Sequence, residues 1–382
     1  MSTPSTLAVV ESVLDEGRLS ALVGRTVRAA RLRVKPDVSL TVGLEHPGTS
    51  RPVGWARLLW PVSRVKADNA ARRARRHGRR TEQHELGDGM ILQLGRLAAD
   101  PALVEHTDAA ARRAVALEPD DARVLRYNPL RRLVMRTAVG VVRITSTPQD
   151  DEILLRDLIE GRVPVPERVR LPGTETGPPV HVSALRLVGD GDLGRVTSLG
   201  ATAAAGAGLA ALHALTGRLP AEAARRLPGG RPAGRGPEAA HISILRALAP
   251  PLAARVEALG RRLPALPRGR RVLAHGDFTP DQVLVRLEDD AVWLTDFDRS
   301  RLAPAELDLG SYLAVVDPET GAALLRGYAD AGGDLPDGAG LRAGIAHARM
   351  ARLVESLRHA DPLWRTRIDQ ALGELEETCA AH

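Results

Sequence analysis

The most constraining feature of this sequence is the stretch RVLAHGDFTPDQVLVRLEDDAVWLTDFD, which covers residues 271–298. Its two short apolar runs are separated by the polar residues 288–290, a pattern that predicts a β-hairpin. Asp277 precedes the first predicted strand and Asp296 ends the second, so the hairpin would bring both carboxylates to the same end. Gln282 lies between them and would add an amide oxygen. Oxygen ligands of this kind suit a Mg²⁺ ion that carries nucleotide phosphates.

The length and composition are those of a globular protein. The chain has 382 residues and a hydrophobic fraction of 44%, which is enough for two or three domains. Cys379 is the only cysteine, so neither a disulfide framework nor a cysteine-based zinc site can form within one chain. The N-terminal segment has no long apolar run, and no stretch reaches the length of a membrane span. We therefore expect a cytoplasmic protein without a membrane partner.

The net charge of +6 raises the question of a nucleic-acid partner. Nearly all of the basic residues are arginine, since lysine occurs only at Lys35 and Lys66. The densest basic run, ARRARRHGRR at residues 71–80, has no interleaved aromatic residues that could stack on bases. The run is more typical of a solvated helix face than of a nucleic-acid site.

Two strand–turn–strand units share a common spacing. The first is RLRVKPDVSLTVGLE and the second is RYNPLRRLVMR. The corresponding positions are Arg33, Pro36, Leu40 and Val42 in the first unit, and Arg126, Pro129, Leu133 and Met135 in the second. A duplicated hairpin and a chance similarity both account for this spacing.

The second unit continues with a predicted strand (GVVRIT), a helix (PQDDEILLRDLIEG) and another strand (VHVSALRLV). Most of the remaining chain is predicted to be helical, apart from the hairpin in residues 271–298. The order of elements therefore indicates an α+β fold.

Four motifs occur in order and at workable spacing in residues 271–315: HGD at 275–277, Gln282, DFD at 296–298 and the segment ELDLGSYLA around Asp308. They resemble the aminoglycoside phosphotransferase and sugar-kinase superfamily, whose members are relatives of the protein kinases. The family pattern is H-G-D-x-x-x-x-N, an apolar strand, D-F or D-W, and an acidic D-L-A segment. Glutamine in place of the asparagine is similar to the maltokinase branch, whose members also carry an N-terminal cap.

The resemblance implies a bilobal, protein-kinase-like α+β fold with a small β-rich N-lobe and a large helical C-lobe. We expect an N-terminal α/β cap domain in residues 1–118, the N-lobe in 119–190, and the C-lobe with its catalytic hairpin in 191–382. The weaker part of the likeness reaches back to about Val141, so the cap lies outside the common family core.

The resemblance also implies roles for the hairpin residues. Asp277 would orient the acceptor hydroxyl and take its proton while the γ-phosphoryl group transfers. Asp296 and Gln282 would hold Mg²⁺, with the carbonyl oxygen of the glutamine replacing that of the usual asparagine. Asp298 would either assist the metal or lie exposed in a turn. Asp308 would brace the catalytic loop.

Three further positions follow from the same resemblance. Arg143 stands where the family has a strand lysine that meets the nucleotide phosphates, and its acidic partner would be Glu152, with Asp151 as an alternative. An exposed strand arginine is the competing interpretation, because arginine and lysine are not equivalent. His275 is expected to be a packed structural residue. The turn NPLRR lacks the glycine of a phosphate-covering loop, and Arg131 and Arg132 could neutralise phosphate there instead.

The sequence thus predicts an ATP-dependent, or GTP-dependent, Mg²⁺-requiring kinase. Its acceptor would be a hydroxyl of a sugar, an aminoglycoside or a similar small polar metabolite. Two alternatives remain: a relative that binds nucleotide or ligand without transferring phosphate, and a basic nucleic-acid-binding protein.

Overall fold

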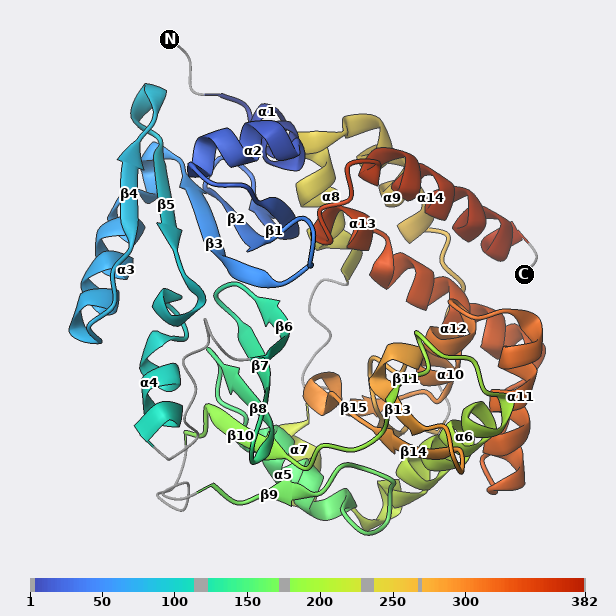
Figure 1. Cartoon of the computed structure of the whole chain (residues 1–382). Helices are drawn as coiled ribbons and strands as arrows, with labels where there is room; N and C mark the ends of the chain where they lie inside the picture. Colours follow the sequence, from blue (N-terminus) through green and yellow to red (C-terminus); the bar gives the residue numbers. More distant parts are fainter. Residues whose placement is uncertain (1–3, 113–122, 172–178, 228–236, 267–269, 381–382) are drawn as a thin grey trace.

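The computed structural model describes residues 4–112, 123–171, 179–227, 237–266 and 270–380. The predicted boundary between cap and N-lobe, at residue 118, lies outside these ranges. Figure 1 shows the cap and the N-lobe as two neighbouring sheet units, and the helical C-lobe beside them.

The cap is built on a five-stranded antiparallel sheet with the strand order β1-β2-β3-β5-β4. Its strands are β1 (Arg28–Lys35), β2 (Ser39–Glu45), β3 (Pro52–Leu59), β4 (Glu82–Glu85) and β5 (Ile91–Gly95). Helices α1 (Thr6–Leu14) and α2 (Glu16–Val23) precede the sheet, α3 (Val65–Arg76) joins β3 to β4, and α4 (Val104–Arg112) follows β5.

The N-lobe repeats this plan. Its sheet has the order β6-β7-β8-β10-β9, and its helix, α5 (Asp150–Ile159), again follows the third strand. The strands are β6 (Arg123–Asn128), β7 (Arg132–Thr137), β8 (Gly140–Thr145), β9 (Arg168–Val169) and β10 (Val182–Leu185). The likeness of the two hairpins therefore extends to the whole unit, which supports duplication over chance similarity.

The C-lobe is helical and contains the hairpin that the sequence predicts. Strands β13 (Val283–Arg286) and β14 (Ala291–Leu294) pair in antiparallel register, with Val283 opposite Leu294. Strand β11 (Gly191–Asp192) extends this sheet, and β12 (Val272–Ala274) pairs with β15 (Arg301–Ala303). The helices are α6 (Leu199–Ala214), α7 (Ala221–Arg226), α8 (Pro237–Leu248), α9 (Pro250–Gly260), α10 (Glu306–Leu313), α11 (Pro318–Asp330), α12 (Gly338–Arg352), α13 (Glu355–Arg358) and α14 (Trp364–Ala380).

Glycines allow two pairs of C-lobe helices to approach each other closely. A Cβ atom at Gly310 of α10 would lie 2.2 Å from the carbonyl carbon of Gly344 in α12. Similarly, a Cβ atom at Gly327 of α11 would lie 1.9 Å from the carbonyl oxygen of Ala203 in α6. The backbones of both helix pairs are therefore in direct contact, and no larger side chain fits without separating them.

The largest hydrophobic core joins the cap to the end of the chain. It packs apolar residues of α1, α2 and the cap sheet against side chains from α8, α9 and α12–α14, including the fully buried Trp364. In Figure 1 the red C-terminal helices accordingly lie beside the blue cap. A second core fills the C-lobe around α6 and the hairpin, and a third joins the N-lobe sheet to Trp55 of the cap.

One helical segment, Leu199–Arg218, has 20 residues and is apolar enough to cross a membrane by length and composition alone. This corrects the expectation that no stretch reaches that length. The segment is 56% buried within the protein, and its helix α6 packs against α11 and β14. We interpret it as the central helix of a globular lobe.

The basic helix α3 buries only Ala67, Ala70 and Ala74, and the arginines of its second half are exposed. It is the solvated helix face that the sequence predicts.

Candidate active site

Asp308 anchors the loop that carries Asp277. It is fully buried near the start of α10, and its carboxylate accepts hydrogen bonds from the backbone N–H groups of His275 (2.7 Å) and Gly276 (2.8 Å). It also lies 3.1 Å from Nε2 of His213. Burial acts to raise the pKa of Asp308, but the hydrogen bond and charge of His213 outweigh it and lower the pKa. An ionised carboxylate thus fixes the backbone directly before Asp277.

Thr295 ties two loops to the end of β14. Its N–H and its hydroxyl both donate to the carbonyl oxygen of Gln282, at 2.9 and 3.1 Å. Its own carbonyl oxygen accepts from Nε2 of the buried His275 at 2.7 Å. Because Thr295 directly precedes Asp296, these bonds hold Gln282 and the HGD loop at the same end of the hairpin as Asp296.

The Gln282 side chain is buried and oriented by one neighbour. Its Nε2 donates to Asp281 at 2.7 Å. No residue in the described part of the chain donates a hydrogen bond to its Oε1. The amide oxygen therefore keeps its capacity to bind a cation.

Asp277 is half-buried and faces the segment after Asp296. Gly276 has a φ of 83°, and a Cβ atom there would lie 2.1 Å from the carbonyl oxygen of Arg299. Only glycine accommodates both the left-handed backbone and this close approach. The Arg299 side chain then returns to Asp277, with Nη1 at 3.1 Å from the carboxylate.

Three arginines surround Asp296, which ends the hairpin in the left-handed conformation at φ 64° and ψ 58°. Arg132 Nη1 donates to its Oδ1 at 2.8 Å, and the guanidinium groups of Arg126 and Arg143 lie 3.9 and 4.0 Å from the carboxylate. Burial acts to raise the pKa of Asp296, but the charges and hydrogen bond of these arginines hold it well below its usual range. Asp296 is therefore ionised across the physiological pH range.

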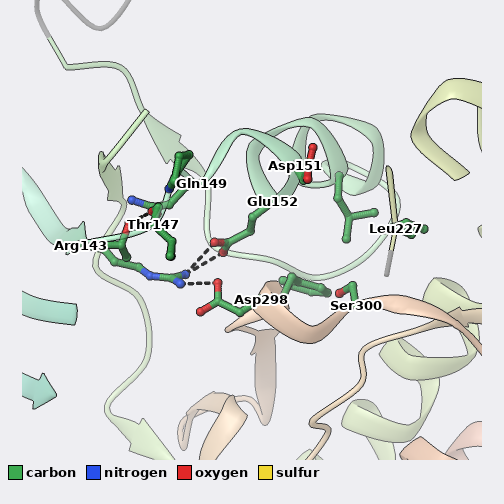
Figure 2. Close-up of a pocket in the computed structure, with 12 residues that line it drawn as sticks. Arg143, Thr147, Gln149, Asp151, Glu152, Leu227, Asp298 and Ser300 are labelled. Carbon is green, nitrogen blue, oxygen red and sulfur yellow. Dashed lines mark hydrogen bonds and ion pairs between the residues drawn. The ribbon is translucent and has the colours of Figure 1, made fainter. Parts of the chain in front are cut away.

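Arg143 on β8 connects α5 to the short 3-10 helix η7 (Phe297–Arg299). Its Nη1 donates to both carboxylate oxygens of Glu152 at 2.8 Å, and its Nη2 pairs with Asp298 (Figure 2). Asp298 also contacts Arg132 at 3.2 Å. Burial raises the pKa of Glu152 to about 7 against the opposing charge of Arg143, and the nearby carboxylate of Asp298 adds to this rise. The pair predicted from the sequence is present, and Asp151 is not part of it.

A pocket of about 250 Å³ lies beside this ion pair, between α5 and η7 (Figure 2). Its lining includes Arg143, Thr147, Gln149, Glu152, Asp298 and Ser300. Sites that enclose whole small molecules usually measure about 300–1,000 Å³. This pocket therefore has room for only part of a nucleotide.

The turn between β6 and β7 stands where a glycine-rich loop would be expected, and the cap holds it in place. Leu130 at its tip has a φ of 63°, a conformation that is uncommon for a leucine. The buried Asp100 of the cap accepts hydrogen bonds from the Leu130 N–H (2.8 Å) and from the Tyr127 hydroxyl (2.7 Å). The turn is thus fixed by a carboxylate from the segment that follows the cap sheet.

The structure gathers the site residues predicted from the sequence around one end of the hairpin. They are Asp277, Gln282, Asp296, Asp298, Arg143, Glu152, His275 and Asp308. Sequence reasoning missed Asp100, Arg126 and Thr295, and it considered Arg132 only as a phosphate ligand. Asp100 gave no signal, because its partners lie about thirty residues away on a different sheet. Thr295 could have been noticed as the residue between the second strand and its terminal aspartate.

Comparison with known proteins identifies the family of the chain. Residues 130–344 match the model of the Phosphotransferase enzyme family. No curated protein matches the sequence significantly.

Solved structures resemble the chain at low sequence identity. The gentamicin complex of APH(2")-IIa is 15% identical, with 72% of this chain and 95% of that chain covered and a TM-score of 0.49. Macrolide 2'-phosphotransferase MphH from Brachybacterium faecium is 21% identical, with coverages of 71% and 98% and a TM-score of 0.43. Spectinomycin phosphotransferase in complex with ADP and spectinomycin is 14% identical, with coverages of 68% and 92% and a TM-score of 0.46.

The family match spans more than half of the chain, and it includes the anchored hairpin and both elements of the Arg143 ion pair. The chain therefore belongs to the phosphotransferase enzyme family and is a small-molecule kinase.

Proposed function

We propose that this protein transfers the γ-phosphoryl group of ATP or GTP to a hydroxyl of a small polar molecule, with Asp277 as the general base. The observation that carries the proposal is the double anchoring of the site: Asp308 fixes the backbone before Asp277, and Thr295 holds Gln282 beside Asp296. Phosphoryl transfer depends mainly on positioning and electrostatic stabilisation, and buried anchors of this kind provide positioning.

Gln282 and Asp296 fit a Mg²⁺ ion. One amide oxygen without a donor and one ionised carboxylate suit an ion that commonly binds one or two protein oxygens together with substrate phosphates. Consistent with so sparse a set, no cluster of three or more acidic, histidine or cysteine ligands occurs in the described residues. When bound, the ion would neutralise charge on the transferring phosphates.

Arg132 and Arg143 would bind the nucleotide phosphates. In the structure their guanidinium groups pair with Asp296 and Asp298, so two cations lie beside the proposed metal ligand Asp296, which supports this role. Guanidinium groups bind phosphate oxygens through paired hydrogen bonds and can take the place of the amides of a glycine-rich loop.

Asp277 would accept the proton of the acceptor hydroxyl as its oxygen bonds to the γ-phosphorus. Arg299 holds the carboxylate from one side and leaves it partly exposed to solvent, where a substrate can approach. Asp308 and His275 would act only by positioning this loop.

The test separates binding from transfer. Mg²⁺ with ATP or GTP should raise the melting temperature of the wild-type protein, because a ligand of the native state stabilises it. Asp277→Asn should keep this shift and lose transfer to an acceptor panel by a factor of about 10²–10⁴. Asp289→Asn, in the exposed hairpin turn, is the matched control and should retain both. A nucleotide-dependent shift without transfer to any acceptor would instead indicate the non-catalytic relative.

A further inference from the structure

A group of arginines lies near the ion pair that Asp277 forms with Arg299. Strand β1 of the cap alternates between its two faces: Leu32 and Val34 are buried in the cap core, while Arg31 and Arg33 face away from it. Strand β1 therefore presents arginine side chains on the face of the cap sheet that points away from the cap core.

Two contacts connect the cap sheet to neighbouring elements. A Cβ atom at Gly43 of β2 would lie 3.3 Å from Cγ of Pro129, so the cap sheet touches the β6–β7 turn. Helix α13 packs against β1, as Figure 1 also shows. Arg33 of the cap, Arg131 of the turn and Arg358 of α13 thus lie on elements that contact one another, and Arg131 and Arg358 are near enough to Arg299, the partner of Asp277, for their charges to interact.

The electrostatics agree with this convergence. Partial burial lowers the pKa of Arg131, and the positive charges of Arg33, Arg358 and Arg299 lower it further. Burial likewise lowers the pKa of Arg358; the charge of Glu355 opposes this shift, and the charge of Arg299 adds to it. The guanidinium groups are therefore close enough to repel one another.

The local carboxylates do not balance this charge. Asp277 is paired with Arg299, and Glu355 is paired with Arg352 at 3.0 Å. Within the described ranges, no carboxylate lies within ion-pair distance of Arg33, Arg131 or Arg358. Three guanidinium groups without a carboxylate at ion-pair distance thus lie near the Asp277–Arg299 pair, although the charge of Glu355 still acts on Arg358, whereas Arg132 and Arg143 are paired directly with Asp296 and Asp298.

We propose that Arg33, Arg131 and Arg358 bind an anionic group, a phosphate monoester or a carboxylate, carried by the acceptor molecule. This deepens the proposed function and rests on it: the acceptor is an acidic hydroxyl compound, such as a sugar phosphate or a sugar acid. In the reaction the acceptor oxygen forms a bond to the γ-phosphorus, the bond from that phosphorus to the β-phosphate oxygen breaks, and the hydroxyl proton passes to Asp277. The same arginines disfavour cationic acceptors, because like charges repel.

The first experiment measures anion binding without catalysis. Inorganic phosphate is titrated calorimetrically into protein saturated with Mg²⁺ and ADP, so that the nucleotide site is already filled. Phosphate should bind to the wild type, and Arg33→Ala, Arg131→Ala and Arg358→Gln should each weaken binding about tenfold or more. Arg261→Ala, an exposed arginine of the C-lobe paired with Glu257, is the matched control and should have no effect. Absence of phosphate binding, or equal binding by all variants, overturns the proposal.

The second experiment compares matched acceptors, namely glucose, glucose 6-phosphate, gluconate and a cationic aminoglycoside. The acidic members should be phosphorylated preferentially, and Arg33→Ala should raise the KM for them while the KM for ATP stays within about twofold of the wild-type value. Transfer only to neutral or cationic acceptors overturns the inference and leaves the proposed kinase function intact. Arginine-dependent phosphate binding without transfer to any acceptor supports the anion site and refutes the proposed function.

Discussion

Replacing Asp308 by asparagine should loosen the catalytic loop and destabilise the C-lobe. The buried carboxylate accepts from two backbone N–H groups, of His275 and Gly276, and contacts His213. Asparagine has only one oxygen that can accept a hydrogen bond. Its NH₂ group would therefore face at least one of the groups that donate to the carboxylate of Asp308. Hydrogen bonds to charged groups contribute about 1.5–3 kcal/mol each, and an unpaired buried donor has a similar cost. We therefore expect the free energy of unfolding to fall by about 2–4 kcal/mol.

The assay is urea unfolding, combined with the acceptor panel. Asp317→Asn is the matched control, since Asp317 also accepts from two backbone N–H groups, of Glu319 and Thr320, but does so on the exposed surface as the N-cap of α11. Asparagine and aspartate cap helices almost equally well, so this variant should change stability by less than about 0.5 kcal/mol. Phosphate transfer should fall in Asp308→Asn alone. Equal unfolding midpoints for the two variants would refute the reasoning.

Two further changes test the packing. His241 is buried in α8, and burial lowers its pKa to about 4. Between pH 4 and about 6.5 the unfolded chain therefore binds more protons than the folded protein, so the free energy of unfolding falls as the pH falls. Between pH 7 and pH 5, His241→Leu should therefore lose about 2 kcal/mol less stability than the wild type; parallel pH profiles would contradict this. Gly310→Ala should cost about 1–3 kcal/mol, because its Cβ would overlap α12. Gly373→Ala in α14, where nothing lies within 4 Å of the new Cβ, should stabilise by about 0.5–1 kcal/mol. Melting temperatures that change in the same direction would argue against the close helix contact.

The local parts of the site could be predicted from the sequence. The hairpin at residues 283–294 follows from two apolar runs around a polar turn. It lies next to the HGD motif because only a few residues separate the two in the sequence. Arg143 and Glu152 are only nine residues apart, so their contact between β8 and α5 could be predicted from the sequence pattern together with the family resemblance. The spacing of the two similar strand–turn–strand units indicated a repeated hairpin but could not decide between duplication and chance, and the repetition of the whole sheet is visible only in the structure.

Long-range packing accounts for what the sequence did not reveal. Asp100 fixes the β6–β7 turn from the segment after the cap sheet, and nothing in the neighbouring sequence distinguishes it from other loop aspartates. Arg132 reaches Asp296 across 164 positions, so only the docking of the two lobes brings them together. The membrane-length segment was missed because its many glycines and alanines keep its mean hydropathy modest. In the structure the segment is partly buried within the C-lobe.

The core shared by the cap and the C-terminal helices has a consequence for biosynthesis. The cap sheet leaves the ribosome well before α12–α14, yet those late helices cover much of its apolar surface. In a nascent chain that has completed the cap, that surface therefore stays open to aggregation until α12–α14 have been synthesised. Premature termination near residue 340 would leave the cap without the part of its hydrophobic cover that α12–α14 provide, a species that chaperones and proteases should recognise.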